Sequence, residues 1–334
     1  MLRYIGTRLL QMIPVLFGIT LISFALMYLS PSDPAMMMLT AEGNAPTPDL
    51  VEAVRHEMGL DQPAYIQYLN WLVGMFHGDF GVSHTFTAPV ASVLLSHLGV
   101  TLILSLLALI VVLVVAIPLG VLAGLKHNSV VDYLIQIFEY SSFSMPTFWL
   151  ALLLIYLFAV TLGVLPAISN STMPEGYVLP VVALLFSYLG RLIGQVRVDV
   201  IEEMKKPYIV GLRSRGLSMK TIVRKHVLRN ALMPSITIIG LIVGALLSGS
   251  LTTEIVFSLE GLGSMAVQAI TTRDYFLVQG YVFITAVFFI VVNLIVDILY
   301  HVLNPQVNFT HTRKARTFKG TQAADASKRE ESEF

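Results

Sequence analysis

Six stretches of the sequence are dominated by apolar side chains and are long enough to cross a membrane. They lie at about 9–29, 99–125, 131–163, 178–197, 233–257 and 279–303. A helix needs roughly 20 mostly apolar residues to span a hydrocarbon core about 30 Å thick. Only 13% of the 334 residues are charged, whereas about a quarter are charged in soluble domains. The sequence therefore predicts an all-α integral membrane protein with six transmembrane helices.

The Lys and Arg residues are concentrated in alternate loops. The segment 30–98 contains one cation, Arg55, and seven acidic residues, whereas the segment 197–230 contains nine cations. Cytoplasmic loops of membrane proteins are enriched in Lys and Arg. We therefore expect residues 30–98 outside the cytoplasm and 197–230 inside it. The N-terminus at 1–8 and the tail at 306–334 are then cytoplasmic too, and the first helix at 9–29 is expected to be a retained signal anchor.

The extracytoplasmic segment 30–98 is too long for a simple connector and contains helix signals of its own. Thr47, Pro48 and Asp49 are typical of a helix start, and Gly59 would end that helix. A second run with apolar periodicity extends from Tyr65 to Phe76. These patterns predict two short helices on the outer face of the helix bundle. The transmembrane core is expected at residues 99–305, with five helices. The tail is polar and mixed in charge, which indicates disorder.

The cytoplasmic segment between the fourth and fifth runs contains signals for two short helices, at 208–215 and 218–230. Pro207 would break the chain before them, and Pro234 would start the next span. Gly216 joins the two helices and is free to adopt the left-handed conformation that a helix end often needs. Ser218 is a suitable cap for the second helix.

The second of these helices is amphipathic. Its apolar face would carry Met219, Ile222, Val223 and Val227, and its cations would point mostly elsewhere. A basic amphipathic loop fits either anionic lipid headgroups or a docking protein. Composition alone does not choose between these two partners.

Several strings together identify a family. YIVGLRSRGLS followed by HVLRNALMPSITIIG resembles the cytoplasmic signature of ATP-binding-cassette (ABC) importer permeases of the dipeptide, oligopeptide and nickel branch. That resemblance extends over about residues 8–307 and also includes RLLQMIPVLFGITLISF, GDFGVS, SMPTFWLALLL, GLGSMAVQAITTRDYFLVQG and VNLIVDILYHVLNP. The chain departs from the family pattern at four positions. Leu212 and Ser214 replace alanines before the glycine, and Leu259 and Glu260 replace tryptophan and proline before GLG.

The resemblance implies a permease subunit of a binding-protein-dependent importer in the bacterial inner membrane. The subunit would form half of the translocation path for small peptides or for nickel and metallophore chelates. Its implied partners are two nucleotide-binding ATPase subunits, a second homologous permease, an extracytoplasmic solute-binding protein and membrane lipid, but no nucleic acid. ATP and magnesium would bind the partner subunits, and this chain would hold no cofactor.

In the family, the cytoplasmic segment forms a coupling helix that sits in a groove of the ATPase. The resemblance therefore implies an ATPase-coupling region at 208–230. We expect its apolar face to pack on the ATPase and its arginines to set the orientation. The residues expected to carry the coupling are Tyr208, Leu212, Arg213, Ser214, Arg215, Gly216, Met219, Ile222, Val223, Arg224, Val227, Arg229, Asn230 and Pro234.

The sequence contains no pattern for catalysis by this chain. ATP hydrolysis needs a glycine-rich phosphate loop with its lysine, and GLSMKT and GLKHN lack the required spacing. His56 and Glu57 do not form the zinc-protease pattern, and the chain has no cysteine. We therefore expect no catalytic residue, and ATP must be hydrolysed by another chain.

We single out four of the acidic and basic residues inside the apolar runs, where charges are costly and often functional. Glu139 and Arg191 lie at similar depths, so we consider an ion pair between them, the alternative being that each faces water or the interface separately. Glu254 would either face the path near an outer gate or bond to a neighbouring helix. Asp297 lies toward the inner end of the sixth run. All four are candidates for the path or a gate.

Four extracytoplasmic histidines, at positions 56, 77, 84 and 97, match no compact metal-ligand motif, so we expect no metal site.

Two other functions compete with an importer subunit. A self-contained secondary transporter or channel would predict inverted repeats and charges at the membrane midplane, and no convincing repeat is visible. A membrane scaffold for a signalling complex would also use a basic cytoplasmic loop.

Overall fold

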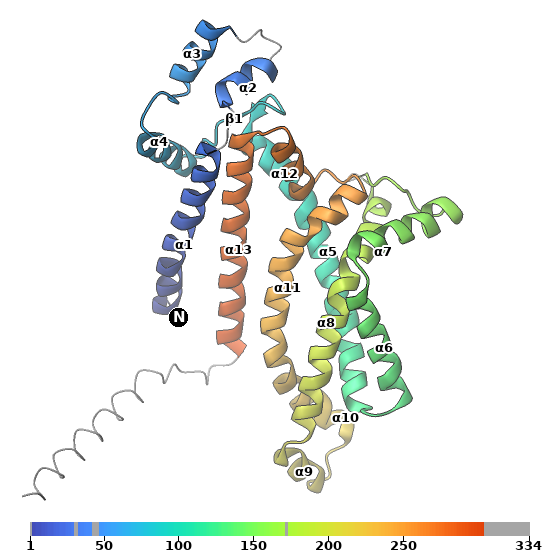
Figure 1. The fold of residues 1–334 in the computed structure, drawn as a ribbon. Coiled ribbons are helices and arrows are strands. Elements are labelled where there is room, and N and C mark those ends of the chain that lie inside the picture. The colour runs from blue at the N-terminus through green and yellow to red at the C-terminus, as the bar shows by residue number, and fades with distance from the viewer. Residues whose placement is uncertain (1, 30–32, 42–46, 171–172, 304–334) are drawn as a thin grey trace, which may run out of the picture.

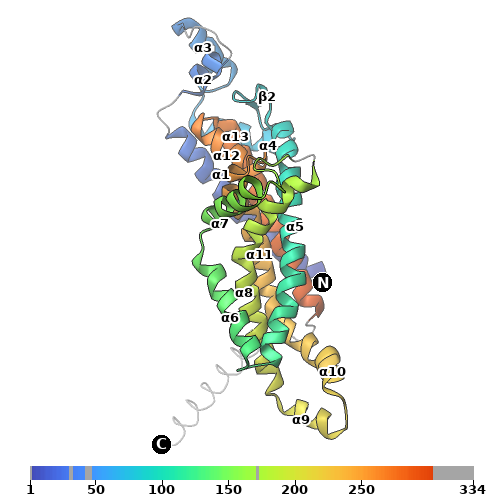
Figure 2. The same cartoon turned by 90° about the vertical axis from the view of Figure 1, so that its right-hand side faces the viewer.

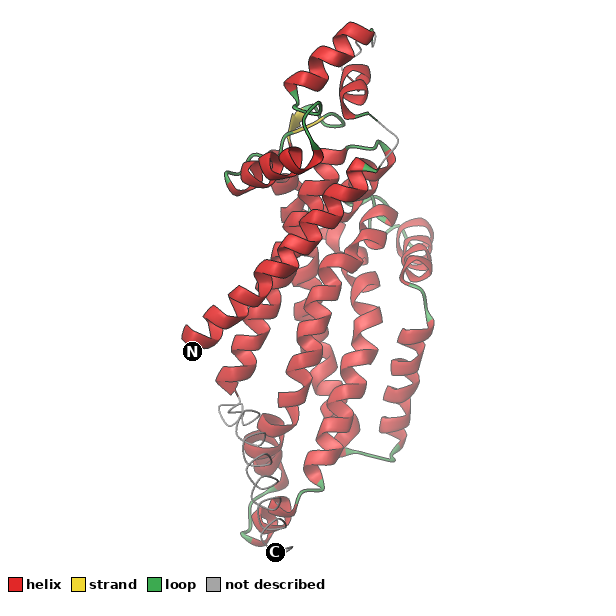
Figure 3. Ribbon diagram, turned by 60° about the vertical axis from the view of Figure 1, so that its left-hand side comes forward, coloured by secondary structure: helices red, strands yellow, loops and turns green. Residues whose placement is uncertain are grey.

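A computed structural model describes residues 2–29, 33–41, 47–170 and 173–303 of the protein. Long helices lie side by side in an elongated bundle, with short helices at both ends (Figure 1). Colouring by secondary structure shows a short strand region at one end and helices almost everywhere else (Figure 3). The predicted all-α membrane architecture is confirmed.

The long helices follow the apolar runs of the sequence. They are α1 (Leu2–Tyr28), α5 (Val90–Leu125), α6 (Val130–Ser144), α7 (Thr147–Leu154) with the π-helical η1 (Ile155–Thr161), α8 (Val178–Met204), α11 (Leu228–Val256) and α13 (Tyr275–Leu303). The shorter elements are α2 (Pro34–Ala41), α3 (Pro48–Glu57), α4 (Ala64–Phe76), β1 (Val82–Ser83), β2 (Ala88–Pro89), the 3-10 turn η2 (Pro174–Tyr177), α9 (Pro207–Ser214), α10 (Met219–Ile222), the π-helical η3 (Val223–Val227) and α12 (Leu262–Thr271).

Five helical stretches in the described part of the chain are long and apolar enough to cross a membrane. They lie in α1, α5, η2 with α8, α10 through α11, and α13. A sixth crossing results if α6 and the α7–η1 helix count as one span. The start of α1 and the end of α13 both point toward the α9 end of the bundle (Figure 1). The predicted tail at 306–334 lies outside the described residues.

The prediction of a continuous helix at 131–163 is wrong. The two helices on either side of Pro146 are bent by 103° relative to each other. Met145 has an extended backbone, with φ −97° and ψ 120°. The proline ring disfavours the helical conformation for the residue before it, and it also removes a backbone donor. The apolar run is therefore real, but it does not form one straight helix.

Two predicted helix boundaries also differ from the structure. Helix α5 begins at Val90 rather than at 99 and has 36 residues, which is about 54 Å at 1.5 Å per residue. It therefore extends well beyond a hydrocarbon core about 30 Å thick. Pro234 does not start a span, because it lies inside α11. Packing by neighbouring helices allows a membrane helix to continue through a proline.

The helices α5 and α8 form the most extensive helix–helix contact among the described residues. A Cβ atom added at Gly120 of α5 would lie 2.7 Å from Cβ of Val196, and one added at Gly124 would lie 2.8 Å from Cβ of Val200. Small residues let helix backbones approach closely inside a membrane. The core around this contact includes the fully buried Leu192 of α8. The other partners of α8 are α6, α7 and α11, so α8 is the central helix of the bundle.

The module α2–α4 lies at the other end of the bundle from α9 (Figure 1). The predicted helix starting at Pro48 is present, and Gly59 follows it with φ +66°. The predicted helix from Tyr65 to Phe76 corresponds to α4. Tyr68 of α4 packs edge-on against Phe24 of α1, and the hydroxyl groups of Tyr68 and Thr20 are 3.0 Å apart. These contacts attach the module to α1.

The close approach of α5 and α8 predicts that a single added methyl group is harmful. We expect Gly120→Ala to lower the free energy of unfolding by about 1–3 kcal/mol, because overpacking forces the two helices apart. Gly99→Ala in the same helix is the matched control, since a Cβ there has no atom within 4 Å. Thermal unfolding of the purified protein in detergent measures both. Equal unfolding temperatures for the two variants would contradict this account of the contact.

Candidate functional site

Residues 205–230 form an arm that projects from the end of the bundle opposite α2–α4 (Figures 1 and 2). It contains α9, α10 and η3, and it leads directly into α11. Lys206 has an extended backbone before Pro207, which occupies the first turn of α9. The arm therefore begins where the sequence predicts a break.

The predicted break inside the arm is also present. Gly216 has φ +79°, a conformation that is costly for residues with a Cβ atom. The side chain of Ser218 accepts a hydrogen bond from the Thr221 amide at the start of α10. The second helix differs from the prediction, however, because it does not end near residue 230. It continues through the π-helical turn η3 into α11.

The inner face of the arm belongs to the core of this chain. Ile222 and Val227 are completely buried, and Ile209 is nearly so, within the same apolar cluster as α5 and α8. The predicted packing of Ile222 and Val227 on another protein is therefore wrong. Their apolar stripe is real, but the arm folds back and uses it to close the core of the bundle. Leu212 is half-buried against the same cluster, and Val223 is also half-buried.

The outer face of the arm is exposed and cationic. Val210 of α9 is 66% exposed and Met219 is 42% exposed. Met219 belongs to the predicted coupling set, whereas Val210 does not. The other exposed members of that set are Arg213, Ser214, Arg215, Gly216, Arg224, Arg229, Asn230 and Pro234, and Lys220 and Lys225 are also exposed. The arm therefore presents a basic surface with a small apolar patch.

A buried carboxylate connects the arm to the bundle. Glu203, near the end of α8, is only 4% exposed. Its carboxylate accepts hydrogen bonds from the Tyr208 hydroxyl at 2.6 Å and from Nδ2 of Asn230 at 3.0 Å, and Nζ of Lys206 is 2.6 Å away. Burial, followed by the hydrogen bond to Glu203, raises the pKa of Tyr208. The phenol therefore stays a donor, and Glu203 joins α8, α9 and the start of α11.

Two further carboxylates fasten α8 to its neighbours. Asp199 accepts hydrogen bonds from the Ser235 hydroxyl of α11 at 2.7 Å and from Nε2 of Gln195 at 2.9 Å. Asp132 of α6 is completely buried and forms a bidentate pair with Arg197 of α8, at 2.6 and 2.9 Å. Bidentate pairs of this kind are strong and directional. Displacement of α8 would therefore be transmitted to both α6 and α11.

The ion pair considered between Glu139 and Arg191 is not formed. Arg191 is exposed, whereas the Glu139 carboxylate lies against Gly194 of α8, where an added Cβ would be in steric conflict with it. The pair that does join the third and fourth apolar runs is Asp132–Arg197. Glu139 and Arg191 lie at similar depths in the sequence, but Arg197 is about 1.7 turns beyond Arg191 along α8 and reaches Asp132 at the start of α6.

The chain matches a family model described as "binding-protein-dependent transport system inner membrane component" over residues 116–309. It belongs to this family. The model for the N-terminal part of such components matches residues 1–105. The resemblance to ABC importer permeases found in the sequence is thereby confirmed, and the chain is a multi-pass permease subunit.

Curated relatives cover nearly the whole permease. The dipeptide transport system permease protein DppB of Escherichia coli strain K12 is 34% identical, covering 92% of this chain and 99% of DppB. The metal-staphylopine import system permease protein CntB of Staphylococcus aureus is 33% identical, covering 92% of this chain and 98% of CntB. A solved structure of the MetNI methionine ABC transporter in an inward-facing conformation shares the fold, with a TM-score of 0.50 and 19% identity over 63% of this chain and 96% of that chain.

Glu254 makes structural hydrogen bonds in this permease. It is completely buried near the end of α11 and accepts a hydrogen bond from the Thr101 hydroxyl at 2.7 Å. It also accepts from the amides of Gly263 and Ser264 at 2.8 and 3.0 Å. A carboxylate is stabilised at a helix N-terminus, where amide groups lack partners within the helix. Of the two expectations for Glu254, the structure supports the bond to neighbouring helices.

The close approach of the GLGS segment to α11 requires glycine at positions 261 and 263. A Cβ added at Gly261 would lie 2.3 Å from the carboxyl carbon of Glu254, and one at Gly263 would lie 2.6 Å from Cα of Leu251. The chain therefore needs glycine at both positions for α12 to approach α11. Leu259, which departs from the family pattern, is buried here. The side chain of Asp297 lies outside the described residues.

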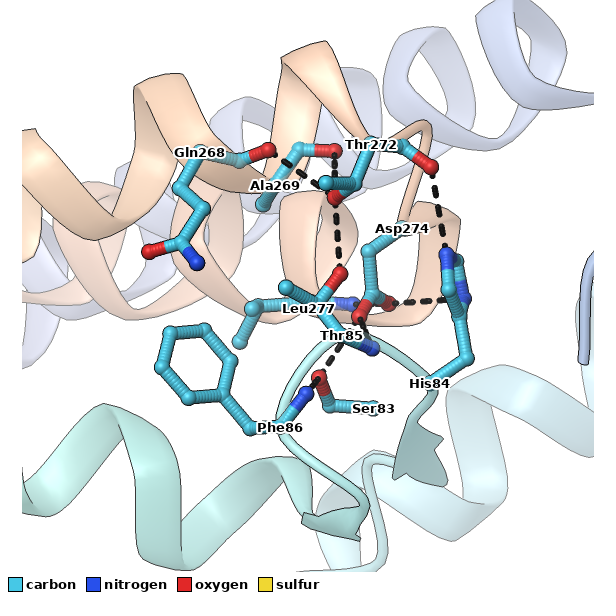
Figure 4. Close-up of polar contacts among 9 residues, drawn as sticks. All are labelled: Ser83, His84, Thr85, Phe86, Gln268, Ala269, Thr272, Asp274 and Leu277. Atoms are coloured by element: carbon cyan, nitrogen blue, oxygen red, sulfur yellow. Dashed lines mark hydrogen bonds and ion pairs between the residues drawn. The ribbon is translucent and has the colours of Figure 1, made fainter. Parts of the chain in front are cut away.

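A second polar cluster, which sequence analysis missed, is centred on the buried Asp274 (Figure 4). Its Oδ2 atom accepts hydrogen bonds from the Ser83 hydroxyl at 2.6 Å and the Thr85 amide at 3.0 Å. Its Oδ1 atom accepts one from the Leu277 amide in the first turn of α13, at 3.2 Å. Asp274 thus fixes the β1–β2 hairpin to the α12–α13 turn. An aspartate just before an apolar run was the available signal, because Asp is a preferred helix cap.

The four histidines have separate surroundings. Nε2 of His84 is 3.2 Å from the Thr272 carbonyl oxygen. His77 and His97 each use Nδ1 to contact a backbone carbonyl one turn earlier, and His56 is highly exposed. No group of three or more potential metal-ligating His, Cys, Asp or Glu side chains occurs within the described ranges. The structure therefore gives the histidines no common site.

The contacts of Glu203 predict that its removal loosens the arm. We expect Glu203→Ala to lower the free energy of unfolding by about 2 kcal/mol, because hydrogen bonds to a buried charged group are lost. Trypsin should also cleave the arm faster after Arg213 and Arg215. The control is Glu202→Ala, an exposed neighbour in the same helix. Unchanged cleavage and stability in Glu203→Ala would show that this carboxylate does not hold the arm.

Proposed function

We propose that this permease forms half of the translocation path of an ATP-driven importer, and that its arm docks on a nucleotide-binding ATPase subunit. The observation that carries the proposal is the two-sided arm. Its inner face is built into the core through Ile222 and Val227, while its outer face leaves Val210 and several cations exposed. Because the arm packs into the core on one face and is exposed on the other, a protein that binds the exposed face could move the helices of the bundle.

The buried carboxylates give the arm a mechanical connection to the spans. Glu203 joins it to α8 and to Asn230 at the start of α11. Asp199 and Asp132 then link α8 to α11 and α6. In our proposal, closure of the ATPase subunits displaces the arm, and these links carry the displacement to three helices. Arg213, Arg215 and Arg224 set the orientation of docking electrostatically.

We infer the orientation from the distribution of cations. The arm and both chain ends are cytoplasmic, and α2–α4 lie outside, because Lys and Arg are concentrated on the cytoplasmic side of membrane proteins. The outer module would then be accessible to a solute-binding protein. Two ATPase subunits, holding ATP and magnesium, and a second homologous permease complete the importer. This permease would supply no catalytic residue and hold no cofactor.

The proposed substrates are small peptides or metal chelates. DppB is named for dipeptide transport and CntB for metal-staphylopine import, and their identities to this chain are nearly equal. We favour peptides. In cells that lack this chain, uptake of labelled dipeptide should be lost and should return with the wild-type gene. Loss of nickel-metallophore uptake with normal dipeptide uptake would reassign the substrate but would leave the importer proposal intact.

Because Val210 is exposed on the arm, a substitution there should weaken ATPase docking without preventing folding. We expect Val210→Glu to insert and fold normally, because Val210 is 66% exposed, but to reduce co-purification of the ATPase subunits about tenfold or more. The comparison variant is Met36→Glu, which also replaces an exposed apolar side chain with glutamate, but in α2. It should retain the ATPase subunits. Full retention by Val210→Glu would remove α9 from the docking surface.

Reconstitution distinguishes the importer from its rival. An importer requires ATPase subunits and receptor-stimulated ATP hydrolysis, whereas a self-contained secondary transporter needs neither. Liposomes containing this chain alone should show no solute uptake when an ion gradient is applied. Uptake under that condition would favour the secondary transporter and would contradict the importer proposal.

A further inference from the structure

A groove between α1 and α13 has features that neither the fold nor the proposed transport cycle explains. It encloses about 420 Å³ and is lined by α1, the end of α12 and the first turns of α13. No residue of α5, α8 or α11 lines it, so it lies outside the core cluster around the α5–α8 contact. Both long helices that form it are among the candidate membrane spans. We call it the α1–α13 groove.

The polarity of the α1–α13 groove changes along its length. The part that lies deeper in the spans is lined by apolar side chains, including Ile19, Ile22 and Val282. The end near α12 is lined by Arg273, Tyr275 and Gln279. Arg273 lies two residues before the start of α13, where the span meets the headgroup region. Val282 is seven residues into α13, or about 10 Å deeper. The groove is therefore amphipathic along the membrane normal.

Gln279 supplies an independent sign of a bound molecule. Its side chain is almost fully buried, at 1% exposure. Its amide nitrogen donates to the Met27 sulfur at 3.2 Å, but its Oε1 atom has no hydrogen-bond partner in the described part of the chain. Buried polar atoms are rarely left unpaired in folded proteins. Because Gln279 lines the groove, a donor from an occupant of the groove would satisfy this oxygen.

A neighbouring cavity gives such a donor space. It encloses about 190 Å³, shares Met27 and Gln279 with the groove, and includes the carboxylate-bearing Asp79 and the amide-bearing Asn70 in its lining. Gln279 and Met27 therefore line both cavities. The lining of the groove includes a cation, Arg273, and the lining of the neighbouring cavity includes an acid, Asp79. That distribution complements a headgroup carrying a negative phosphate and a positive ammonium group.

We propose that the α1–α13 groove binds one molecule of phosphatidylethanolamine. The phosphate lies beside the Arg273 guanidinium, which binds phosphate through directional, charge-assisted hydrogen bonds. The ammonium group donates to Oε1 of Gln279 on the side of Asp79. An acyl chain lies along Ile22 and Val282. The site does not depend on the proposed coupling to an ATPase.

Other occupants fit the groove less well. A helix of a second permease would place mostly apolar side chains against it and leave Oε1 of Gln279 without a donor. A water-soluble solute would lose its hydration against a largely apolar wall. A phospholipid has apolar and charged parts in the order that the groove requires. Phosphatidylcholine has the same phosphate and chains, but its quaternary ammonium has no N–H donor, which makes it the matched control ligand.

The proposal predicts a headgroup preference that one substitution removes. The assembled transporter is purified, stripped of lipid in detergent, and supplied with phosphatidylethanolamine or phosphatidylcholine of identical acyl chains. Native mass spectrometry should show about tenfold tighter binding of phosphatidylethanolamine, which corresponds to about 1.4 kcal/mol. Gln279→Leu should reduce the preference to about one, whereas Gln268→Leu, at an exposed glutamine of α12, should keep it. Equal binding of both lipids to the wild type, or an unchanged preference in Gln279→Leu, would overturn the proposal.

A crosslinking experiment tests the occupant directly. The natural chain contains no cysteine, so Ile22→Cys provides a single attachment point for a photoreactive group in the groove. In the assembled transporter in native membranes, illumination should attach phospholipid at this position. Crosslinks mainly to another protein chain would show that a partner helix fills the groove and would overturn the lipid assignment.

Discussion

The close contact between α5 and α8 is the constraint on which the rest of the structure depends. Within a bilayer, apolar side chains gain little by leaving lipid for protein, so helices associate through close packing and buried polar contacts. Gly120 and Gly124 allow α5 to approach Val196 and Val200 of α8 directly. That approach places α8 at the centre of the bundle, where it can contact α6, α7 and α11.

Buried carboxylates then connect this central helix to its neighbours, so that a movement of the arm is transmitted to α8. Asp132, Asp199 and Glu203 are each paired, and each joins α8 to a different neighbour or segment. An unpaired charge at such positions would be strongly destabilising, so these links are expected to persist as the helices move. The arm is consequently part of the bundle rather than an appended loop, which is the physical basis of its proposed role in coupling.

At the opposite end of the bundle, buried carboxylates again join separate helices. Glu254 receives the first amides of α12, and Asp274 caps α13 while holding the β1–β2 hairpin. Both carboxylates satisfy helix N-termini that would otherwise leave buried donors unpaired. Gln279, which lines the α1–α13 groove, differs from these two carboxylates, because its buried Oε1 atom has no hydrogen-bond partner in the described residues. This difference is why we assign a ligand there and structural roles to Glu254 and Asp274.

The sequence by itself determined the family, the apolar runs, and the local signals at Pro48, Gly59, Gly216 and Ser218. These features depend on composition, motif order and backbone preferences, which act over a few residues. Only the tertiary structure decided the partners of charged and apolar side chains. It turned Ile222 and Val227 inward, formed the Asp132–Arg197 pair rather than the Glu139–Arg191 pair that the sequence left as one alternative, and bent the third run at Pro146. Periodicity defines a helix face but does not specify which surface covers it, because burial and pairing depend on contacts between segments that are distant in the sequence.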